Sequence, residues 1–276
     1  MKLKSFSKIN LSLRVLRKLK NGMHDIETNS VLVNLVDNIN ITNNNKDIVI
    51  FYGKHKKKIN SKKNSILTSL KLLRDQKKIQ GYFKVKVKKN IPVYAGLGGG
   101  TGNAVSIIKY FLKERIDERM TELFEKKIGS DFRLFLHSFS FQKKLKKVAS
   151  NKNKANFFFI LIFPNINCKT KDIYKRVKTY SQSSRGKYLK KMSKKDFVDM
   201  LKRDRNDLQE IVEKKYPKIS HLIKAISIQK GCIISRLTGT GSICYGIFNS
   251  KKLAKLAATK LKRKYPNYWC AITKTI

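Results

Sequence analysis

Acidic residues are scarce in this 276-residue sequence. Only 18 Asp and Glu stand against 63 Lys and Arg, which gives a formal net charge of +45. A field of that sign attracts any phosphate-bearing molecule, so it does not by itself separate nucleotides from nucleic acids. The basic residues are spread along the chain, in runs such as Lys56–Lys58, Lys143–Lys147 and Lys190–Lys195. We interpret most of these lysines as solvated surface.

Cysteine pairs and long apolar runs are also missing. The four cysteines form no C-x-x-C pair, which argues against a zinc site and a disulfide framework and favours a reducing, cytoplasmic location. The longest apolar run, Phe157–Phe163, is too short to span a membrane and suits a buried strand. No apolar signal segment precedes Lys2–Lys8, so we expect the fold to begin almost at Met1.

Strand-like and helix-like patterns follow one another irregularly. Alternating apolar residues predict a strand at Tyr82–Lys88, and helical spacing predicts a helix at Lys252–Arg263. No regular strand–helix–strand repeat runs through the chain, which favours an α+β fold. The length suffices for one large domain or for two ordinary domains. We expect them at residues 1–150 and 151–276, separated near the Lys- and Asn-rich stretch Gln142–Asn156.

The most informative stretch is rich in glycine: Pro92-Val-Tyr-Ala-Gly96-Leu-Gly98-Gly-Gly-Thr-Gly102-Asn-Ala104. It lies between a predicted strand and a predicted helix, where unpaired N–H groups and the helix dipole favour an anion. Glycine lets the main chain approach that anion closely. The spacing fits neither a Walker loop nor the G-x-G-x-x-G fingerprint. A flexible connector is the alternative, but so many glycines would cost a connector conformational entropy for no gain.

Other positions are ambiguous when each is taken alone. Lys8 is most simply a surface charge, and Asp131 fits a helix N-cap. His24 could be a turn residue or could read a ligand. The segment Thr238–Ser242 fits either a hairpin turn or a second phosphate-binding nest. Asp207-Leu-Gln-Glu210 fits a capping box at the start of a helix.

Taken in order, these motifs resemble one family. From about Lys4 to the last predicted strand, the chain is similar to the 4-diphosphocytidyl-2-C-methyl-D-erythritol kinase family of the GHMP kinase superfamily. The glycine loop alone indicates the superfamily, and the motifs around Lys8 and His24 narrow it to this family. The resemblance is carried by Ser7-Lys8-Ile-Asn10-Leu-Ser-Leu13, Asn21-Gly-Met-His24-Asp-Ile-Glu-Thr28, Pro92–Ala104, Gly129-Ser-Asp131, Asn206-Asp-Leu208 and Ser235-Arg-Leu-Thr-Gly-Thr-Gly241.

The resemblance implies a two-domain fold, with an N-terminal domain like ribosomal protein S5 and a C-terminal ferredoxin-like domain. It also implies ATP- and Mg²⁺-dependent phosphorylation of the 2-hydroxyl of 4-diphosphocytidyl-2-C-methyl-D-erythritol, here the CDP-alcohol, in non-mevalonate isoprenoid precursor synthesis. We therefore expect a small-molecule substrate, a cytoplasmic monomer or homodimer, and neither a specific nucleic-acid partner nor a membrane partner. No residue is assigned as a metal ligand.

The family's functional residues fall on matching positions. Asp131 would accept the hydroxyl proton, while Lys8 would polarise the hydroxyl and keep Asp131 ionised. His24 would read the cytosine edge, Tyr174 would stack on the base, and Asn10 would line the substrate site. Two segments would bind phosphates: the ATP loop Pro92, Val93, Tyr94, Ala95, Gly96, Leu97, Gly98, Gly99, Gly100, Thr101 and Gly102, and the turn Thr238, Gly239, Thr240 and Gly241.

Four features depart from the family pattern. Met23 replaces a tyrosine before the histidine, Tyr94 replaces a small residue, and Thr101-Gly102 replaces two serines. A Gly-x-Gly-Glu segment expected after Leu136 is missing, with Gln142–Lys147 in its place.

Two alternatives stay open. One is a GHMP kinase that acts on another small alcohol. The other is a basic nucleic-acid- or membrane-surface-binding protein that keeps the fold without catalysis. The charge favours the second, but no aromatic-rich RNA motif accompanies it. The retention of Lys8, Asp131 and the glycine loop favours an enzyme.

Overall fold

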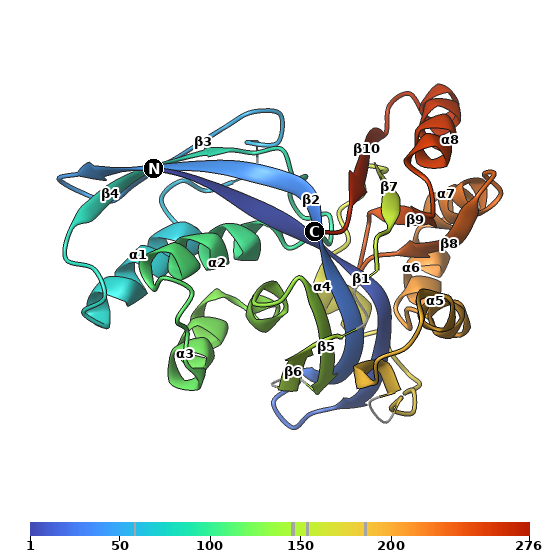
Figure 1. Cartoon of the computed structure of the whole chain (residues 1–276), viewed down its shortest axis with the longest axis horizontal. Helices are drawn as coiled ribbons and strands as arrows, with labels where there is room; N and C mark the ends of the chain where they lie inside the picture. Colours follow the sequence, from blue (N-terminus) through green and yellow to red (C-terminus); the bar gives the residue numbers. More distant parts are fainter. Residues whose placement is uncertain (58, 145–146, 153–154, 185–186) are drawn as a thin grey trace. The chain divides into compact units, whose positions relative to one another are not determined.

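A computed structural model describes residues 1–57, 59–144, 147–152, 155–184 and 187–276 of the chain (Figure 1). Contacts between Cα atoms divide it into two compact units. The first unit comprises Met1–Lys8, Leu35–Val93 and Gly98–Leu136, and the second comprises Ile9–Asn34, Tyr94–Leu97 and His137–Ile276. Two long strands, β1 (Lys2–Lys18) and β2 (His24–Asn44), contribute residues to both units.

The boundary expected near residue 150 falls inside the second unit, and the division of the chain at 150 stays a prediction. Part of the stretch that suggested it is a β-hairpin, formed by β5 (Phe139–Lys144) and β6 (Lys147–Ser150). Two parts of that stretch lie outside the described residues, at 145–146 and 153–154. The first of them belongs to Gln142–Lys147, the segment that stands in place of the missing Gly-x-Gly-Glu.

The first unit combines a sheet with helices. Strand β4 pairs antiparallel with the second half of β2 and parallel with β3. Ile39 and Ile41 of β2 lie opposite Val87 and Val85 of β4, and all four side chains are buried. Helix α1 packs beside α2 and α3. The elements are β3 (Ile48–Tyr52), α1 (Ser65–Asp75), β4 (Tyr82–Lys88), α2 (Gly99–Phe111), α3 (Glu118–Ile128) and the 3-10 helix η1 (Phe132–Phe135).

The second unit is built on an antiparallel sheet of order β10-β7-β9-β8. Helices precede β8 and β10, so the order of elements is β-α-β-β-α-β, the ferredoxin-like arrangement. The elements are β7 (Phe158–Phe163), α4 (Thr170–Tyr174), η2 (Lys187–Leu189), α5 (Lys194–Arg203), α6 (Gln209–Lys215), α7 (Pro217–Ser227), β8 (Cys232–Leu237), β9 (Cys244–Phe248), α8 (Lys251–Lys264) and β10 (Trp269–Lys274). The predicted α+β class is confirmed.

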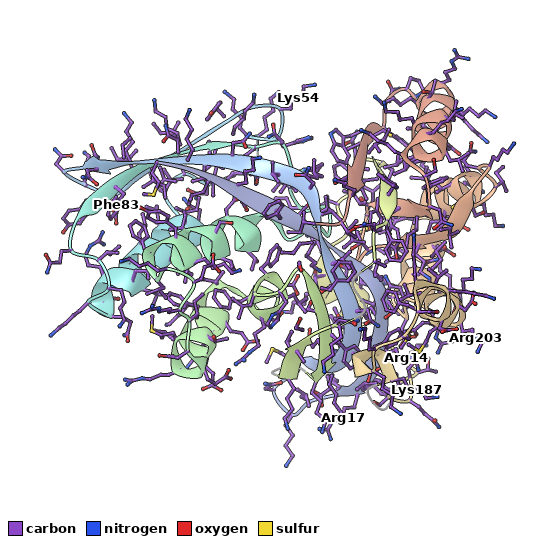
Figure 2. All side chains as sticks on the ribbon, viewed as in Figure 1. Arg14, Arg17, Lys54, Phe83, Lys187 and Arg203 are labelled. Atoms are coloured by element: carbon purple, nitrogen blue, oxygen red, sulfur yellow. The ribbon has the colours of Figure 1, made fainter. Side chains whose placement is uncertain are left out.

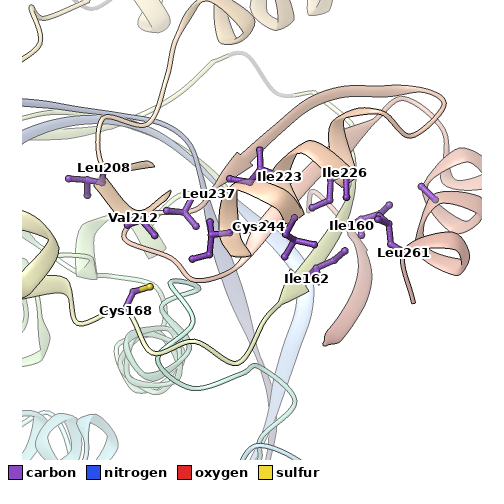
Figure 3. Packing of buried hydrophobic residues seen from close by; sticks show 14 of the residues in the cluster. Ile160, Ile162, Cys168, Leu208, Val212, Ile223, Ile226, Leu237, Cys244 and Leu261 are labelled. Carbon is purple, nitrogen blue, oxygen red and sulfur yellow. The ribbon is translucent and has the colours of Figure 1, made fainter. Parts of the chain in front are cut away.

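The core of the second unit explains the apolar run at Phe157–Phe163. Ile160 and Ile162 of β7 belong to one buried cluster with residues of α6, α7 and α8 (Figure 3). The alternate residues, Phe159 and Leu161, are also buried, and the Phe159 ring lies 6.0 Å from that of Tyr245. Because both faces of this strand are covered, its sequence is continuously apolar rather than alternating.

The predicted capping box at Asp207 is wrong. Helix α6 begins at Gln209 and has Leu208 at its N-cap, without a side-chain capping bond. The Asp207 carboxylate instead accepts hydrogen bonds from the Val15 backbone N–H at 2.8 Å and from Arg205 Nε at 2.7 Å. The carboxylate therefore binds a distant residue, Val15 on β1, and does not cap the helix that follows it.

Basic side chains project from the surface throughout each unit, as at Lys54 and Arg203 (Figure 2). In the part of the chain that the structure describes, no helix is both long enough and apolar enough to cross a membrane.

Candidate active site

Lys8 and Asp131 form an ion pair within the first unit. Lys8 Nζ lies 3.1 Å from Asp131 Oδ2, and the two side chains are 5% and 38% exposed. A buried ammonium group requires a partner, whereas the more exposed carboxylate remains accessible to a ligand. Asp131 precedes η1, but its side chain makes no capping hydrogen bond there. The structure therefore excludes the simple N-cap interpretation and brings together the two residues predicted as a catalytic pair.

Arg133 fixes the segment that carries Asp131. Its buried guanidinium donates to Glu118 at 2.7 and 3.0 Å and to Glu125 Oε2 at 2.9 Å, which ties η1 to α3. The hydrogen bond to Glu118 is the main cause that raises the pKa of Arg133, so the guanidinium stays charged. Sequence reasoning missed this residue, because neither glutamate stands at a spacing that suggests the contact.

The glycine loop contains two kinds of glycine. Gly98 is the N-cap of α2 and has φ 65°; a Cβ there would lie 2.7 Å from the Phe135 ring and 3.4 Å from Lys8 Cγ. A Cβ at Gly102 would lie 2.8 Å from the Phe6 carbonyl oxygen. At these two positions, packing within the protein requires glycine.

Gly100 is different. A Cβ there would come no closer than 3.8 Å to any atom described, the Ser65 Oγ, so the fold does not require glycine. Gly100 lies in the first turn of α2, where backbone N–H groups lack helical partners and no acidic side chain occupies the turn. A bare backbone at this point leaves room for an anion directly at the helix N-terminus.

Two buried polar atoms beside this loop have no hydrogen-bond partner among the described residues. They are Ser5 Oγ and Asn103 Oδ1, and Ser5 Oγ lies 3.1 Å from the position a Gly102 Cβ would take. Buried polar atoms are rarely left unpaired, so these two atoms are exceptions within the packing at this end of α2. Ser5 carries no sequence signal of its own, and Asn103 stood out only as part of the loop.

The second unit holds the other end of the glycine loop. A Cβ at Gly96 would lie 2.8 Å from the Thr238 carbonyl oxygen, and the Ala95 carbonyl accepts a hydrogen bond from the Ile243 N–H at 3.3 Å. Residues Tyr94–Leu97 therefore pack against the turn Thr238–Gly241, and the Tyr94 ring is exposed.

Asn10 and Asn206 hold that turn in place. The Asn10 backbone N–H donates to Thr238 Oγ1 at 3.0 Å, and Asn206 Nδ2 donates to the carbonyls of Leu237 and Gly239 at 2.9 and 2.8 Å. The Thr240 hydroxyl lies 3.1 Å from that of Thr170. The structure thus brings Asn10 together with Thr238–Gly241.

His24 and Tyr174 also lie together in the second unit. Their ring centroids are 5.1 Å apart, with an interplanar angle of 34°. Desolvation and, to a lesser extent, the Lys18 ammonium lower the pKa of His24 below its ordinary value of 6.5. The imidazole is therefore neutral at pH 7 and offers one donor and one acceptor nitrogen.

No group of three or more His, Cys, Asp or Glu that could hold a metal ion occurs in the described ranges.

Comparison with known proteins identifies the family. The model of the GHMP kinases N terminal domain matches residues 64–129, and that of the GHMP kinases C terminal matches residues 187–267. A curated 4-diphosphocytidyl-2-C-methyl-D-erythritol kinase of Pelagibacter ubique (strain HTCC1062) is 34% identical, over 100% of this chain and 99% of the relative. The chain belongs to the 4-diphosphocytidyl-2-C-methyl-D-erythritol kinase family. As a member of it, the protein is an ATP-dependent phosphotransferase.

A further curated relative supports this family, and two solved structures support the GHMP kinase fold. A second curated relative of the same name, from Wolbachia sp. subsp. Drosophila simulans (strain wRi), is 30% identical over 99% of this chain and 98% of its own. A solved 4-(cytidine 5'-diphospho)-2C-methyl-D-erythritol kinase has a TM-score of 0.73 at 18% identity, covering 99% of both chains. A homoserine kinase from Cytophaga hutchinsonii has 0.71 at 15%, covering 100% of this chain and 94% of its own. Because these two scores nearly coincide, the GHMP kinase fold does not distinguish the substrate; the identity over the full length assigns the family.

Proposed function

We propose that this kinase transfers the γ-phosphoryl group of ATP to the 2-hydroxyl of the CDP-alcohol. Full-length similarity to curated relatives named for that substrate supports the choice of acceptor. The observation that carries the chemistry is the ion pair between buried Lys8 and more exposed Asp131.

In this mechanism Asp131 accepts the proton of the acceptor hydroxyl. The oxygen forms a bond to the γ-phosphorus while the bond from that phosphorus to the ADP oxygen breaks. Lys8 polarises the hydroxyl and holds the Asp131 carboxylate through the ion pair at 3.1 Å. Proton transfer to a positioned base is worth on the order of a hundred- to ten-thousand-fold, and alignment and charge stabilisation supply most of the remainder in phosphoryl transfer.

The ATP phosphates would bind along the glycine loop, Pro92–Gly102, at the N-terminus of α2. The missing side chain at Gly100, in the first turn of that helix, supports this assignment. Mg²⁺ usually binds through one or two carboxylates together with substrate phosphates, so the lack of an acidic cluster among the described residues is compatible with it. Thr101 has the one aliphatic hydroxyl of the loop and would contact the phosphates, whose charge the ion would neutralise.

The acceptor would be recognised through its base and its diphosphate. His24 would read the cytosine edge and Tyr174 would stack on the ring, since the two side chains are in contact. The turn Thr238–Gly241 would close over phosphate groups. Asn10 would line the substrate site, because its backbone N–H binds the Thr238 hydroxyl of that turn.

The proposal also covers the organisation of the protein. We place the ATP loop in an N-terminal domain of residues 1–150 and the remaining residues, 151–276, in a C-terminal domain. We further expect a cytoplasmic enzyme that is a monomer or homodimer.

An acceptor panel tests the proposal. ADP release is measured with ATP, Mg²⁺ and either the CDP-alcohol, mevalonate, homoserine or galactose, and the phosphorylated product is identified. We expect turnover with the CDP-alcohol well above that with the others. Turnover with another acceptor instead would establish a GHMP kinase of different specificity. If none of the four acceptors supports ADP release, the assigned substrate is contradicted.

A further inference from the structure

A second tyrosine lies against His24. The ring centroids of His24 and Tyr180 are 6.4 Å apart, with an interplanar angle of 35°. Tyr180 is 46% exposed, so much of its ring is available to a ligand. Together with Tyr174, it gives His24 two aromatic neighbours in the second unit.

The segment that follows Tyr180 is anchored to the strands that lead to His24. The Ser181 N–H donates to the Val15 carbonyl on β1 at 2.8 Å. Glu27, three residues after His24 on β2, is buried and accepts from Ser183 Oγ at 2.8 Å and from the Ser184 N–H at 2.9 Å. These bonds hold the backbone beside Tyr180, and a tyrosine side chain has few torsions left to order on binding.

We propose that Tyr180 is a second base-stacking residue for the cytidine of the acceptor. The inference rests on the proposed function, which places that base at His24 and Tyr174. A flat base has two faces, and one aromatic ring can cover only one of them. The residue before His24 is Met23, and a thioether contacts a ring more weakly than an aromatic face does. Tyr180 supplies an aromatic surface from a different segment.

The test compares Tyr180→Ala, Tyr180→Phe and a control, Tyr52→Ala. Tyr52 is an equally exposed tyrosine, at 44%, on β3 of the first unit. Dissociation constants for CDP, UDP and the CDP-alcohol are measured by calorimetry, with kcat and KM for ATP and the CDP-alcohol. Thermal unfolding of each variant confirms that it is folded.

Loss of one base-stacking ring corresponds to about 5- to 150-fold in affinity. We expect Tyr180→Ala to weaken CDP and the CDP-alcohol by a factor in this range and to raise KM for the CDP-alcohol, with KM for ATP unchanged. Stacking tolerates any base, so UDP should weaken by the same factor. Tyr180→Phe and Tyr52→Ala should stay within about twofold of wild type.

The outcomes separate this inference from the proposed function. If wild type phosphorylates the CDP-alcohol but Tyr180→Ala binds it normally, the role of Tyr180 is wrong and the function stands. A change in the CDP-to-UDP ratio in Tyr180→Ala would contradict stacking and indicate edge recognition. If wild type neither binds CDP nor uses the CDP-alcohol, both proposals fail.

Discussion

Adding one methyl group to the glycine loop should separate its structural role from its binding role. In Gly98→Ala, the residue must keep a left-handed conformation, φ 65°, which costs about 1–2 kcal/mol. Its Cβ also meets the buried Phe135 ring at 2.7 Å, and overpacking typically costs about 1–3 kcal/mol. Together these effects predict a loss of about 2–5 kcal/mol in the free energy of unfolding.

Gly100→Ala should behave in the opposite way. The new Cβ comes no closer than 3.8 Å to the described atoms and lies inside a helix, where alanine is favoured over glycine by up to about 1 kcal/mol. Stability should therefore be unchanged or slightly higher. The methyl group would occupy the space at the helix N-terminus and displace a phosphate from at least one N–H group. Hydrogen bonds to charged groups are worth about 1.5–3 kcal/mol, so ATP should bind about 10- to 140-fold more weakly.

The assay combines urea unfolding with calorimetric titration of ATP. Gly81→Ala serves as the control, since a Cβ there also meets nothing closer than 3.8 Å but lies outside the loop. It should change neither stability nor ATP affinity substantially. Normal ATP binding by Gly100→Ala would refute the placement of the phosphates at the N-terminus of α2.

Further expectations concern stability and base recognition. Lys89→Met leaves fully buried Asp37 without its ion-pair partner and should lower the free energy of unfolding by about 3–5 kcal/mol; a loss below 1 kcal/mol in urea titration would contradict this. Tyr174→Ala should weaken the CDP-alcohol about 5- to 150-fold, and His24→Ala should reduce the preference for cytidine over uridine; titrations with both nucleotides check these effects. The pKa of His24 is lowered on folding, so its protonation opposes the folded state. The contribution of His24 to stability and to CDP affinity should be constant from pH 8 down to 6.5, the ordinary pKa of histidine, and should be lost only as pH falls further. A loss that already occurs above pH 6.5 would contradict the assigned neutral form.

The position of the glycine loop between a strand and a helix could be predicted because the residues that indicate it are neighbours in the sequence. The alternating strand, the glycines and the apolar helical spacing all lie within about one strand–loop–helix unit, and the structure places β4 and α2 on either side of the loop. The distinction between Gly98 and Gly100 could not be predicted, since it depends on Phe135, which approaches from η1.

Other features of the site could not be predicted from local patterns, because they depend on contacts between residues far apart in the sequence. Asp207 had the spacing of a cap, yet its partner Val15 lies 192 positions away. Lys8 and Asp131 are ordinary residues when taken alone, and only the resemblance to a family connected them before the structure showed their contact. Tyr180 follows Tyr174 outside α4 and has no pattern of its own; its proximity to His24 depends on the anchoring of the following serines by Glu27.

Turnover of Asp131→Asn tests the central claim, that the Lys8–Asp131 pair performs the proton transfer of a phosphoryl-transfer reaction. The asparagine has the same shape and can still accept a hydrogen bond from Lys8, but it cannot take the hydroxyl proton. Asp75→Asn, which removes an exposed acid of the same unit, is the matched control. The account predicts that kcat with the CDP-alcohol falls by about a hundred- to ten-thousand-fold, while the ATP dissociation constant remains close to that of wild type and the control. Near-normal turnover of Asp131→Asn would contradict the account, and a large loss of ATP binding would assign the carboxylate to the nucleotide or its metal ion instead.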